Sequence, residues 1–486
     1  MEKVKYLISS NKFNEALLLL LEYAEKNPYD TDVVFHLGKV YFYLKEYSKS
    51  LIYFQQILST KNVDNNLLLW SKYFVANILK SKDIQKALDM LISIREINSK
   101  DIDKEINFLI YDLVKDIQRY NFKGQYNKTI DLYNKYFSYV SKEDKFLFNK
   151  FLNEYEIASK QTVLKSKPRN MLIILSNICN INCIMCGQRH EEKSKIDTKF
   201  INFIKDNLDY LEKIIWQGGE PFLFPQFKDL LLFFSTNKRL KQIVITNFLL
   251  LNEETIEFVI KNKVFLIASI DGANKKTYEK IRKGASFDKI IDNLNVYNRL
   301  LKKFNINEKL MQINFVVMKE NYKEMVDIIE FAHKYGISNV AFIKCVHYDD
   351  NNELKLNKED ILLIKDVLLP CAYDKAQFYN INIDNQINSL FEPNLLNKEN
   401  RLIKNKTDLF CHLPWKELII SYENIIKSDV LCLTNGKYIK TEVDDIMGLW
   451  NSKILLDVRR NIINNNLKYC NSSCKFISED YLKLVN

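Results

Sequence analysis

The 486-residue chain has little glycine and proline, 10 and 7 residues respectively. Because long flexible linkers are built from such residues, the shortage predicts a chain that is folded along most of its length. Long apolar runs are also missing near the start, where Leu17–Leu21 has the acidic neighbours Glu15 and Glu22. A run this short is neither a signal peptide nor a membrane span. We therefore expect a cytoplasmic protein that does not bind membranes.

Cysteine is absent before Cys179, and all 9 cysteines occur from that point onward. The cytoplasm keeps thiols reduced, so these residues favour metal binding over disulfide bonds. Basic blocks are missing too, because the net charge of +10 is spread along the chain, which argues against a nucleic-acid partner. The length and a hydrophobic content of 47% predict a globular protein of several domains.

Residues 1–165 contain a short pattern that recurs along the chain. Asn11–Leu17 matches Lys45–Leu51 at a shift of 34 residues (45 − 11), and weaker copies begin at Asp83 and Gly124. A small residue inside the first three copies lets paired helices approach closely, and the large neighbours then bury against the next unit.

The segment Val34–Tyr41, just before the second copy, resembles the first helix of a tetratricopeptide repeat (TPR). The resemblance implies an all-α, TPR-like array over residues 1–165 whose concave face binds a peptide or protein. A nonrepetitive helical bundle is the alternative, because the later copies of the pattern are loose.

Between residues 168 and 350 short apolar runs alternate with amphipathic stretches. The runs predict strands at Met171–Leu175, Lys213–Trp216, Gln242–Thr246, Val264–Ile270, Gln312–Val317 and Asn339–Ile343. The stretches between them predict helices at Asp197–Leu211, Pro225–Asn237, Asn252–Lys261, Ser286–Lys303 and Tyr322–Tyr335. We expect a parallel α/β domain, either a partial β/α barrel or a doubly wound sheet. In both forms the functional residues lie at the C-terminal ends of the strands.

Three cysteines, Cys179, Cys183 and Cys186, follow the first predicted strand. Three thiolates can hold a four-iron cluster and leave one iron open, whereas four would close its coordination. An open metal position is what the binding and activation of a substrate require. The triad alone could instead be half of a zinc site.

Two further motifs follow later strands. The sequence GGEP begins at Gly218, after the second strand; paired glycines permit a close backbone approach, and the glutamate offers acceptors for an ammonium group. The sequence SIDG begins at Ser269, after the fourth strand, and is followed by Arg282.

Together the three motifs resemble the radical S-adenosylmethionine (SAM) superfamily over roughly residues 170 to 345. The resemblance implies a [4Fe–4S] cluster on the cysteine triad, whose open iron chelates SAM. Reductive cleavage of SAM then gives a radical that removes a hydrogen atom from the substrate. It also implies an electron donor such as flavodoxin or ferredoxin.

The same resemblance assigns residues to SAM. It implies that Gly218, Gly219 and Glu220 contact the amino group of SAM. It also implies that Met185 leans on the adenine, and that Ser269 and Arg282 contact the ribose or the carboxylate. The chain departs from the family pattern after the third strand, where Thr-Asn-Gly is replaced by Thr-Asn-Phe at Phe248, so we expect a different backbone there.

A second cysteine set lies near the end of the chain, at Cys411, Cys432, Cys470 and Cys474. With Trp450, Asn451 and Arg459 nearby, residues 405–486 resemble the SPASM extension of radical SAM enzymes, and residues 351–404 would connect it to the α/β domain. The resemblance implies one auxiliary [4Fe–4S] cluster on these four cysteines, with Cys345 and Cys371 left over. A zinc ribbon is the alternative.

The resulting hypothesis is a radical SAM enzyme that modifies a peptide or protein substrate docked on the repeats. One alternative is the oxidation of a small molecule. Another is a noncatalytic scaffold that carries an iron–sulfur or zinc site. The sequence does not identify the catalytic acid or base, the product or the oligomeric state.

Overall fold

The computed structural model describes residues 1–95, 99–190, 192–307, 310–346, 349–391, 410–422, 425–427, 438–440, 446–464 and 466. The chain divides into two compact units. The first comprises Met1–Asn121 and Gln125–Ala158, and the second comprises Phe122–Gly124 and Ser159–Asn486. No helix within the described ranges is both long and apolar enough to span a membrane.

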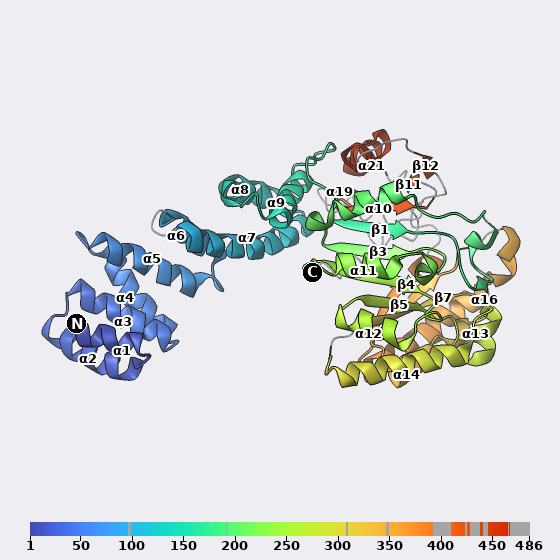
Figure 1. The fold of residues 1–486 in the computed structure, drawn as a ribbon, viewed down its shortest axis with the longest axis horizontal. Coiled ribbons are helices and arrows are strands. Elements are labelled where there is room, and N and C mark those ends of the chain that lie inside the picture. Colours follow the sequence, from blue (N-terminus) through green and yellow to red (C-terminus); the bar gives the residue numbers. More distant parts are fainter. Residues whose placement is uncertain are drawn as a thin grey trace. The chain divides into compact units, whose positions relative to one another are not determined.

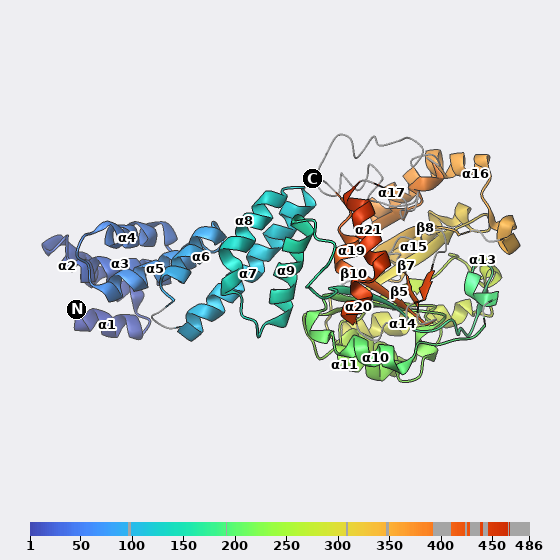
Figure 2. The same cartoon turned by 90° about the horizontal axis from the view of Figure 1, so that it is seen from above.

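The first unit is helical, as predicted (Figures 1 and 2). Its helices are α1 Glu2–Ser9, α2 Phe13–Lys26, α3 Thr31–Tyr43, α4 Tyr47–Ser59, α5 Asn65–Leu79, α6 Ile84–Ser93, α7 Ser99–Phe122, α8 Tyr126–Tyr136 and α9 Lys145–Ala158. Aspartates cap α3 and α5 at their starts, because Asp30 and Asp64 each accept hydrogen bonds from two backbone amides of the first turn.

Small buried residues bring α3 and α4 together. The hydroxyl of Ser50 donates to the carbonyl of Gly38 at 2.8 Å, and a Cβ at Gly38 would lie 2.9 Å from the ring of Phe54. Phe54 in turn stacks on Phe74 of α5, with ring centroids 5.1 Å apart. This packing agrees with the small-residue argument, while the assignment to TPR repeats stays a prediction.

The second unit is built on one sheet, with strand order β12-β11-β10-β1-β3-β4-β5-β7-β8-β9. From β1 to β9 the strands are parallel and follow chain order. A doubly wound sheet reverses its order at a switch point, so this is the winding of a partial β/α barrel. The strands are β1 Asn170–Ile174, β3 Lys213–Gln217, β4 Lys241–Thr246, β5 Phe265–Ser269, β7 Met311–Val317, β8 Asn339–Lys344, β9 Asn382–Gln386, β10 Glu417–Ser421, β11 Ile425–Lys427 and β12 Tyr438–Lys440.

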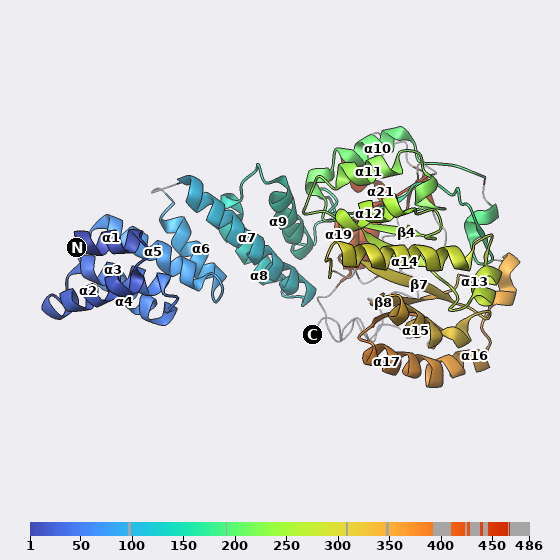
Figure 3. The ribbon, with the colours of Figure 1, turned by 60° about the horizontal axis from the view of Figure 1, so that its bottom comes forward.

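Helices alternate with these strands, and α11, α12 and α14 lie along the outer face of the sheet (Figures 1 and 3). The helices are α10 Thr198–Lys205, α11 Phe227–Phe234, α12 Glu253–Lys261, α13 Lys275–Ile281, α14 Phe287–Lys303, α15 Asp327–Lys334, α16 Lys358–Leu363, α17 Leu369–Phe378, α19 Leu413–Lys416, α20 Ile446–Trp450 and α21 Lys453–Ile463. Asp197 and Asn252, the first residues of two predicted helices, are the N-caps of α10 and α12 and accept hydrogen bonds from their first turns. Gly336 follows α15 with φ +67°, as a helix-ending glycine should.

The barrel sheet extends beyond the predicted boundaries at both ends. Residues 351–404, predicted to be only a connection, contain α16, α17 and β9, and β9 pairs with β8. Within residues 405–486, β10 pairs in parallel with β1, so strands of this segment join the sheet. The polar sequence of β9 and the short run of β10 gave no clear strand signal.

A buried arginine joins the first residues of the second unit to its C-terminal helices. Arg459 of α21 donates to the carbonyl oxygens of Pro414, Thr162 and Trp450, each at 2.9 Å. Its guanidinium also lies 4.6 Å from the ring centroid of Trp450. The side-chain amide of Asn451 accepts a hydrogen bond from the amide of Leu164 and donates one to its carbonyl, each at 2.8 Å. These contacts tie the segment before β1 to the C-terminal helices.

Candidate functional site

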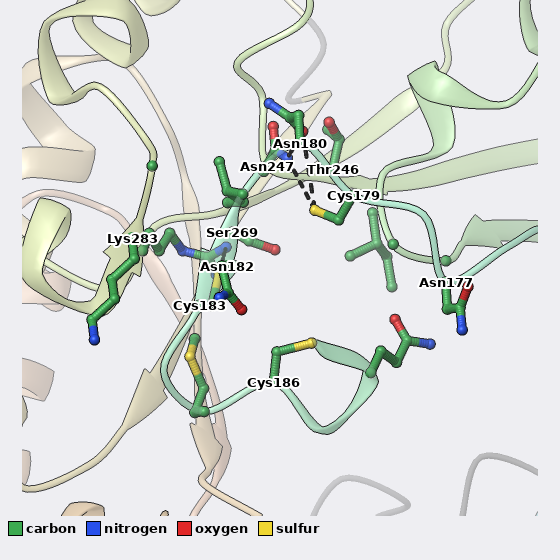
Figure 4. Close-up of a pocket in the computed structure, with 18 of the residues that line it drawn as sticks. Asn177, Cys179, Asn180, Asn182, Cys183, Cys186, Thr246, Asn247, Ser269 and Lys283 are labelled. Carbon is green, nitrogen blue, oxygen red and sulfur yellow. Dashed lines mark hydrogen bonds between the residues drawn. The ribbon is translucent and has the colours of Figure 1, made fainter. Parts of the chain in front are cut away.

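A cavity of about 660 Å³ lies at the C-terminal ends of the barrel strands (Figure 4). Most of the predicted site residues share its wall: Cys179, Cys183, Met185, Cys186, Gly218, Gly219, Ser269 and Arg282. The residues come from the ends of β1, β3 and β5 and from the short strand β6, Arg282–Lys283. The sequence prediction therefore brought together residues that are up to about a hundred positions apart.

The loop that carries the three cysteines is held by a small antiparallel pairing. Its strand β2, Asn182–Cys183, pairs with β6 so that Cys183 lies opposite Arg282. The amide of Ile184 donates to the carbonyl of Ile281 at 3.0 Å, and the amide of Cys186 donates to the carbonyl of Cys183 at 3.2 Å. The triad thus sits on a fixed backbone.

All three cysteines are free thiols on the cavity wall. No group of three His, Cys, Asp or Glu side chains in the described ranges is arranged to hold a single metal ion. Figure 4 shows the sulfur atoms spread around the cavity instead of converging on one point. Three thiols from one loop around an open space are a donor set that can hold a multi-iron cluster.

The glycines of GGEP pack against the cysteine loop. The amide of Gly219 donates to the carbonyl of Ser176 at 2.7 Å, and the amide of Glu220 donates to that of Ile178 at 2.8 Å. A Cβ at Gly219 would lie 2.1 Å from the carbonyl oxygen of Ile178, and one at Gly218 would lie 2.6 Å from that of Ser176. Glycine is required here because the backbone after β3 touches the backbone that leads to Cys179.

Glu220 lies beneath the cavity wall, and its side chain is fully buried. Its carboxylate accepts hydrogen bonds from the hydroxyl of Thr246 at 2.8 Å, the amide of Asn247 at 2.7 Å and the amide of Phe222 at 3.2 Å. Burial raises the pKa of this carboxyl group, and the hydrogen bonds oppose the increase. The carboxylate therefore fixes the turn that follows β4.

That turn reaches the cysteine loop through Asn247, which sequence reasoning did not identify as a site residue. The side-chain amide of Asn247 donates to Asn180 Oδ1 at 2.8 Å and lies 3.8 Å from the sulfur of Cys179. Glu220, Asn247 and Cys179 thus form a connected series from β3 through β4 to the triad. The Thr-Asn part of the family pattern includes Asn247, but it does not show these contacts, which join segments 67 and 68 positions apart.

The backbone after β4 differs from the expectation. Phe248 occupies the position where the family pattern has glycine, and it adopts φ +63°, the left-handed conformation that glycine favours. Its ring is fully buried, and its carbonyl accepts a hydrogen bond of 2.7 Å from Asn293. Burial of the aromatic ring offsets the conformational cost of about 1–2 kcal/mol, so the turn keeps a glycine-like backbone.

A buried ion pair supports a second thiol. Arg282 forms a 2.6 Å ion pair with Asp271 of the SIDG motif, and its guanidinium lies 3.6 Å from the sulfur of Cys183. Burial disfavours the charged form of Arg282, but the Asp271 carboxylate raises the guanidinium pKa above its ordinary value. Burial raises the pKa of the Cys183 thiol to about 11, and Arg282 opposes the shift. A positive group beside this sulfur favours the thiolate that metal binding requires.

The remaining cysteines fall into two groups. Cys345 is buried among Ile281, Met318 and Leu354, and burial raises its pKa to about 12, so it is a packing residue. Cys371 is exposed on α17, and Cys411 is partly exposed beside α19. Cys432, Cys470 and Cys474 lie outside the described residues, so the auxiliary cluster stays a prediction.

Comparison with known proteins matches residues 173–332 to the radical SAM superfamily. A GTP 3′,8-cyclase of Clostridium botulinum strain Okra is 24% identical over 223 residues, which cover 43% of this chain and 68% of the relative. A probable GTP 3′,8-cyclase of Methanocaldococcus jannaschii is 27% identical over 176 residues, covering 35% and 56%. The crystal structure of Streptococcus suis SuiB has a similar fold, with a TM-score of 0.50, 17% identity and coverage of 66% and 74%. Residues 173–332 thus belong to a radical SAM domain.

Proposed function

We propose that Cys179, Cys183 and Cys186 hold the [4Fe–4S] cluster of this chain. The premise is that the chain is a radical SAM enzyme with a [4Fe–4S] cluster and SAM as cofactors. The observation that supports this proposal is the placement of three free thiols from one loop on one cavity wall. When bound, the cofactors supply reductive cleavage of SAM and removal of a hydrogen atom from the substrate. An electron donor such as flavodoxin or ferredoxin would deliver the electron.

The cavity wall provides the remaining contacts to SAM. We assign the amino group to the backbone at Gly218 and Gly219, which flank the thiols. Met185 would pack on the adenine, and Ser269 and Arg282 would bind the ribose or the carboxylate. The carboxylate of Glu220 already accepts three hydrogen bonds below the wall, which favours an indirect role through Asn247.

The proposed substrate is a peptide or protein that docks on the helical unit of residues 1–165. The support is that this unit is a separate compact body of helices outside the radical SAM match. For the C-terminal segment we propose one auxiliary [4Fe–4S] cluster on Cys411, Cys432, Cys470 and Cys474.

A nucleotide or other small molecule is the second candidate substrate, because the curated relatives named above are GTP cyclases. Their similarity is confined to less than half of this chain and does not account for the helical unit. The two candidates differ in the molecular weight of the hydrogen donor.

An isotope experiment separates them. Cells that make this protein are grown in deuterated medium, and their extract is divided into a protein and peptide fraction and a small-molecule fraction. The anaerobically purified enzyme is incubated with each fraction, SAM and dithionite, and deuterium in 5′-deoxyadenosine is measured by mass spectrometry. Deuterium from the protein and peptide fraction alone supports the proposal, whereas deuterium from the small-molecule fraction alone rejects it. A variant with all three triad cysteines changed to alanine is the control for background cleavage.

A further inference from the structure

The helical unit contains two adjoining cavities that share residues of α3. One, of about 310 Å³, lies between α1 and α3, and the other, of about 460 Å³, lies between α3 and α5. Lys39 and Tyr43 line both cavities. The two cavities therefore adjoin along α3 at these residues, and we name them together the α3 groove.

Lys39 is a half-buried cation in the middle of this groove. Neither cavity is lined by an Asp or Glu side chain, and Lys39 forms no ion pair with any carboxylate in the described ranges. Burial lowers the pKa of its ammonium group, because no nearby anion compensates for the lost water. An anion placed beside the ammonium group would restore the lost interaction.

The cavity between α1 and α3 contains two further basic side chains. Lys5 and His36 line the cavity between α1 and α3 together with Lys39. The carboxylate of Asp32 lies 3.7 Å from Lys5 and 3.4 Å from His36, at the exposed start of α3, and it does not line the cavity. Because burial lowers the pKa of His36 and Lys5 already pairs with Asp32, Lys39 supplies the positive charge of the groove, whose wall has no competing carboxylate.

The other end of the groove is aromatic. Trp70 is 47% exposed, and its ring lies 5.5 Å from that of Tyr73 in an edge-to-face arrangement. Phe42 and Phe74 form a second edge-to-face pair, 5.0 Å apart, below them. A half-exposed tryptophan held by neighbouring rings is the kind of rigid apolar surface that anchors a bound side chain.

We propose that the α3 groove binds a peptide segment in which a carboxylate side chain neighbours an aromatic one. The carboxylate pairs with Lys39, and the aromatic ring packs on Trp70. This assignment rests on the proposed function, because it names the chemistry of the peptide that the helical unit recruits. A basic or purely polar segment would leave Lys39 unpaired or repelled and Trp70 uncovered.

The test uses the full-length protein, purified anaerobically, and fluorescein-labelled peptides of alternating residues. The probe alternates Glu with Phe, and three control peptides alternate Gln with Phe, Glu with Ser, and Lys with Phe. Fluorescence anisotropy measures their dissociation constants. The Glu–Phe peptide is expected to bind at least tenfold more tightly than each control, because the charge pair and the aromatic contact each contribute about a factor of ten. Equal affinities, or no saturable binding, would overturn the proposal.

Variants then locate the site. K39Q should weaken the Glu–Phe peptide about tenfold and abolish the preference over the Gln–Phe peptide. W70A should weaken the Glu–Phe and the Gln–Phe peptides to a similar extent, while K61Q, at an exposed lysine outside the groove, should change nothing. Far-UV circular dichroism and thermal melting confirm that each variant is folded. Unchanged binding by a folded K39Q would overturn the assignment.

Two outcomes separate this inference from the proposed function. If the α3 groove binds the Glu–Phe peptide but the hydrogen donor proves to be a small molecule, the groove stands and the peptide-substrate proposal fails. If a peptide is the donor and K39Q and W70A leave its KM unchanged, the function stands and the groove assignment fails. Light scattering tests whether a second copy of the chain fills the groove instead of a peptide. A change of oligomer size in K39Q would show that it does, and this result would also overturn the assignment.

Discussion

Substituting alanine at Gly219 tests how the cysteine loop is held. The added Cβ would lie 2.1 Å from the carbonyl oxygen and 2.4 Å from the carbonyl carbon of Ile178, both backbone atoms. Backbone atoms cannot rotate away as a flexible side chain can, so the loop before Cys179 must move. We expect a loss of stability of about 3 kcal/mol, the upper range for overpacking a tight site. The displacement also separates Cys179 from the other two thiols.

Gly284, which lines the same cavity, provides a matched control. A Cβ there would lie 3.8 Å from the nearest atom, in Ile181, so alanine introduces no clash. Its φ of +91° is unfavourable for alanine, which should cost about 1–2 kcal/mol. The comparison therefore separates a steric collision at the cysteine loop from backbone strain alone.

The assays are iron and sulfide content after anaerobic purification, urea unfolding, and cleavage of SAM. Gly219→Ala should lose most of its triad-bound iron and its SAM cleavage, whereas Gly284→Ala should keep its iron. Normal iron content and stability in Gly219→Ala would refute the argument that the GGEP backbone positions the triad. Equal losses in both variants would show that backbone conformation, not the contact with Ile178, controls the loop.

Three further variants test separate parts of the second unit. Cys179→Ala should abolish formation of 5′-deoxyadenosine with dithionite, and wild-type rates would remove this residue from the cluster. Asp271→Asn should lower the free energy of unfolding by about 3–5 kcal/mol, because Arg282 stays buried without its counter-charge. A loss under about 1 kcal/mol in urea unfolding would contradict this expectation. Arg459→Ala should lower the free energy of unfolding by about 4 kcal/mol, since three carbonyl groups lose a donor. The control Arg460→Ala, at an exposed neighbour, should cost under about 0.5 kcal/mol, and similar losses in calorimetry would refute the role given to Arg459.

The strands that carry the site could be predicted from the sequence, because their apolar runs are bounded by clear polar stretches. Lys213–Trp216 and Gln242–Thr246, for example, were placed within one residue of β3 and β4. Parallel strands of a barrel bring their C-terminal ends to one edge, so motifs after separate strands were expected to meet. This reasoning worked without knowledge of any tertiary contact.

The strand β9 could not be predicted in the same way. Its residues, Asn382–Gln386, are mostly polar and only partly buried, so no apolar period marks it. The backbone of β9 is held by its pairing with β8, and the side chains of β9 give no sign of this pairing. The three hydrogen bonds that Glu220 accepts could not be predicted either, because a motif shows which residue types are present but not which hydrogen bonds each makes.

The contacts that hold the triad differ among its three members. Cys179 is supported through Asn247, which Glu220 positions from below, and Cys183 is supported by Arg282 and the backbone of β6. For Cys186, the hydrogen bonds of the described residues provide only the backbone contact to Cys183. Two thiols are therefore fixed by side chains from the barrel strands and their following segments, while the third depends on the turn that joins it to Cys183. Contacts from elsewhere in the fold position two of the thiols. The spacing of two residues between Cys183 and Cys186 is left to position the third, so this spacing is part of the motif's chemistry and not an incidental feature of the loop.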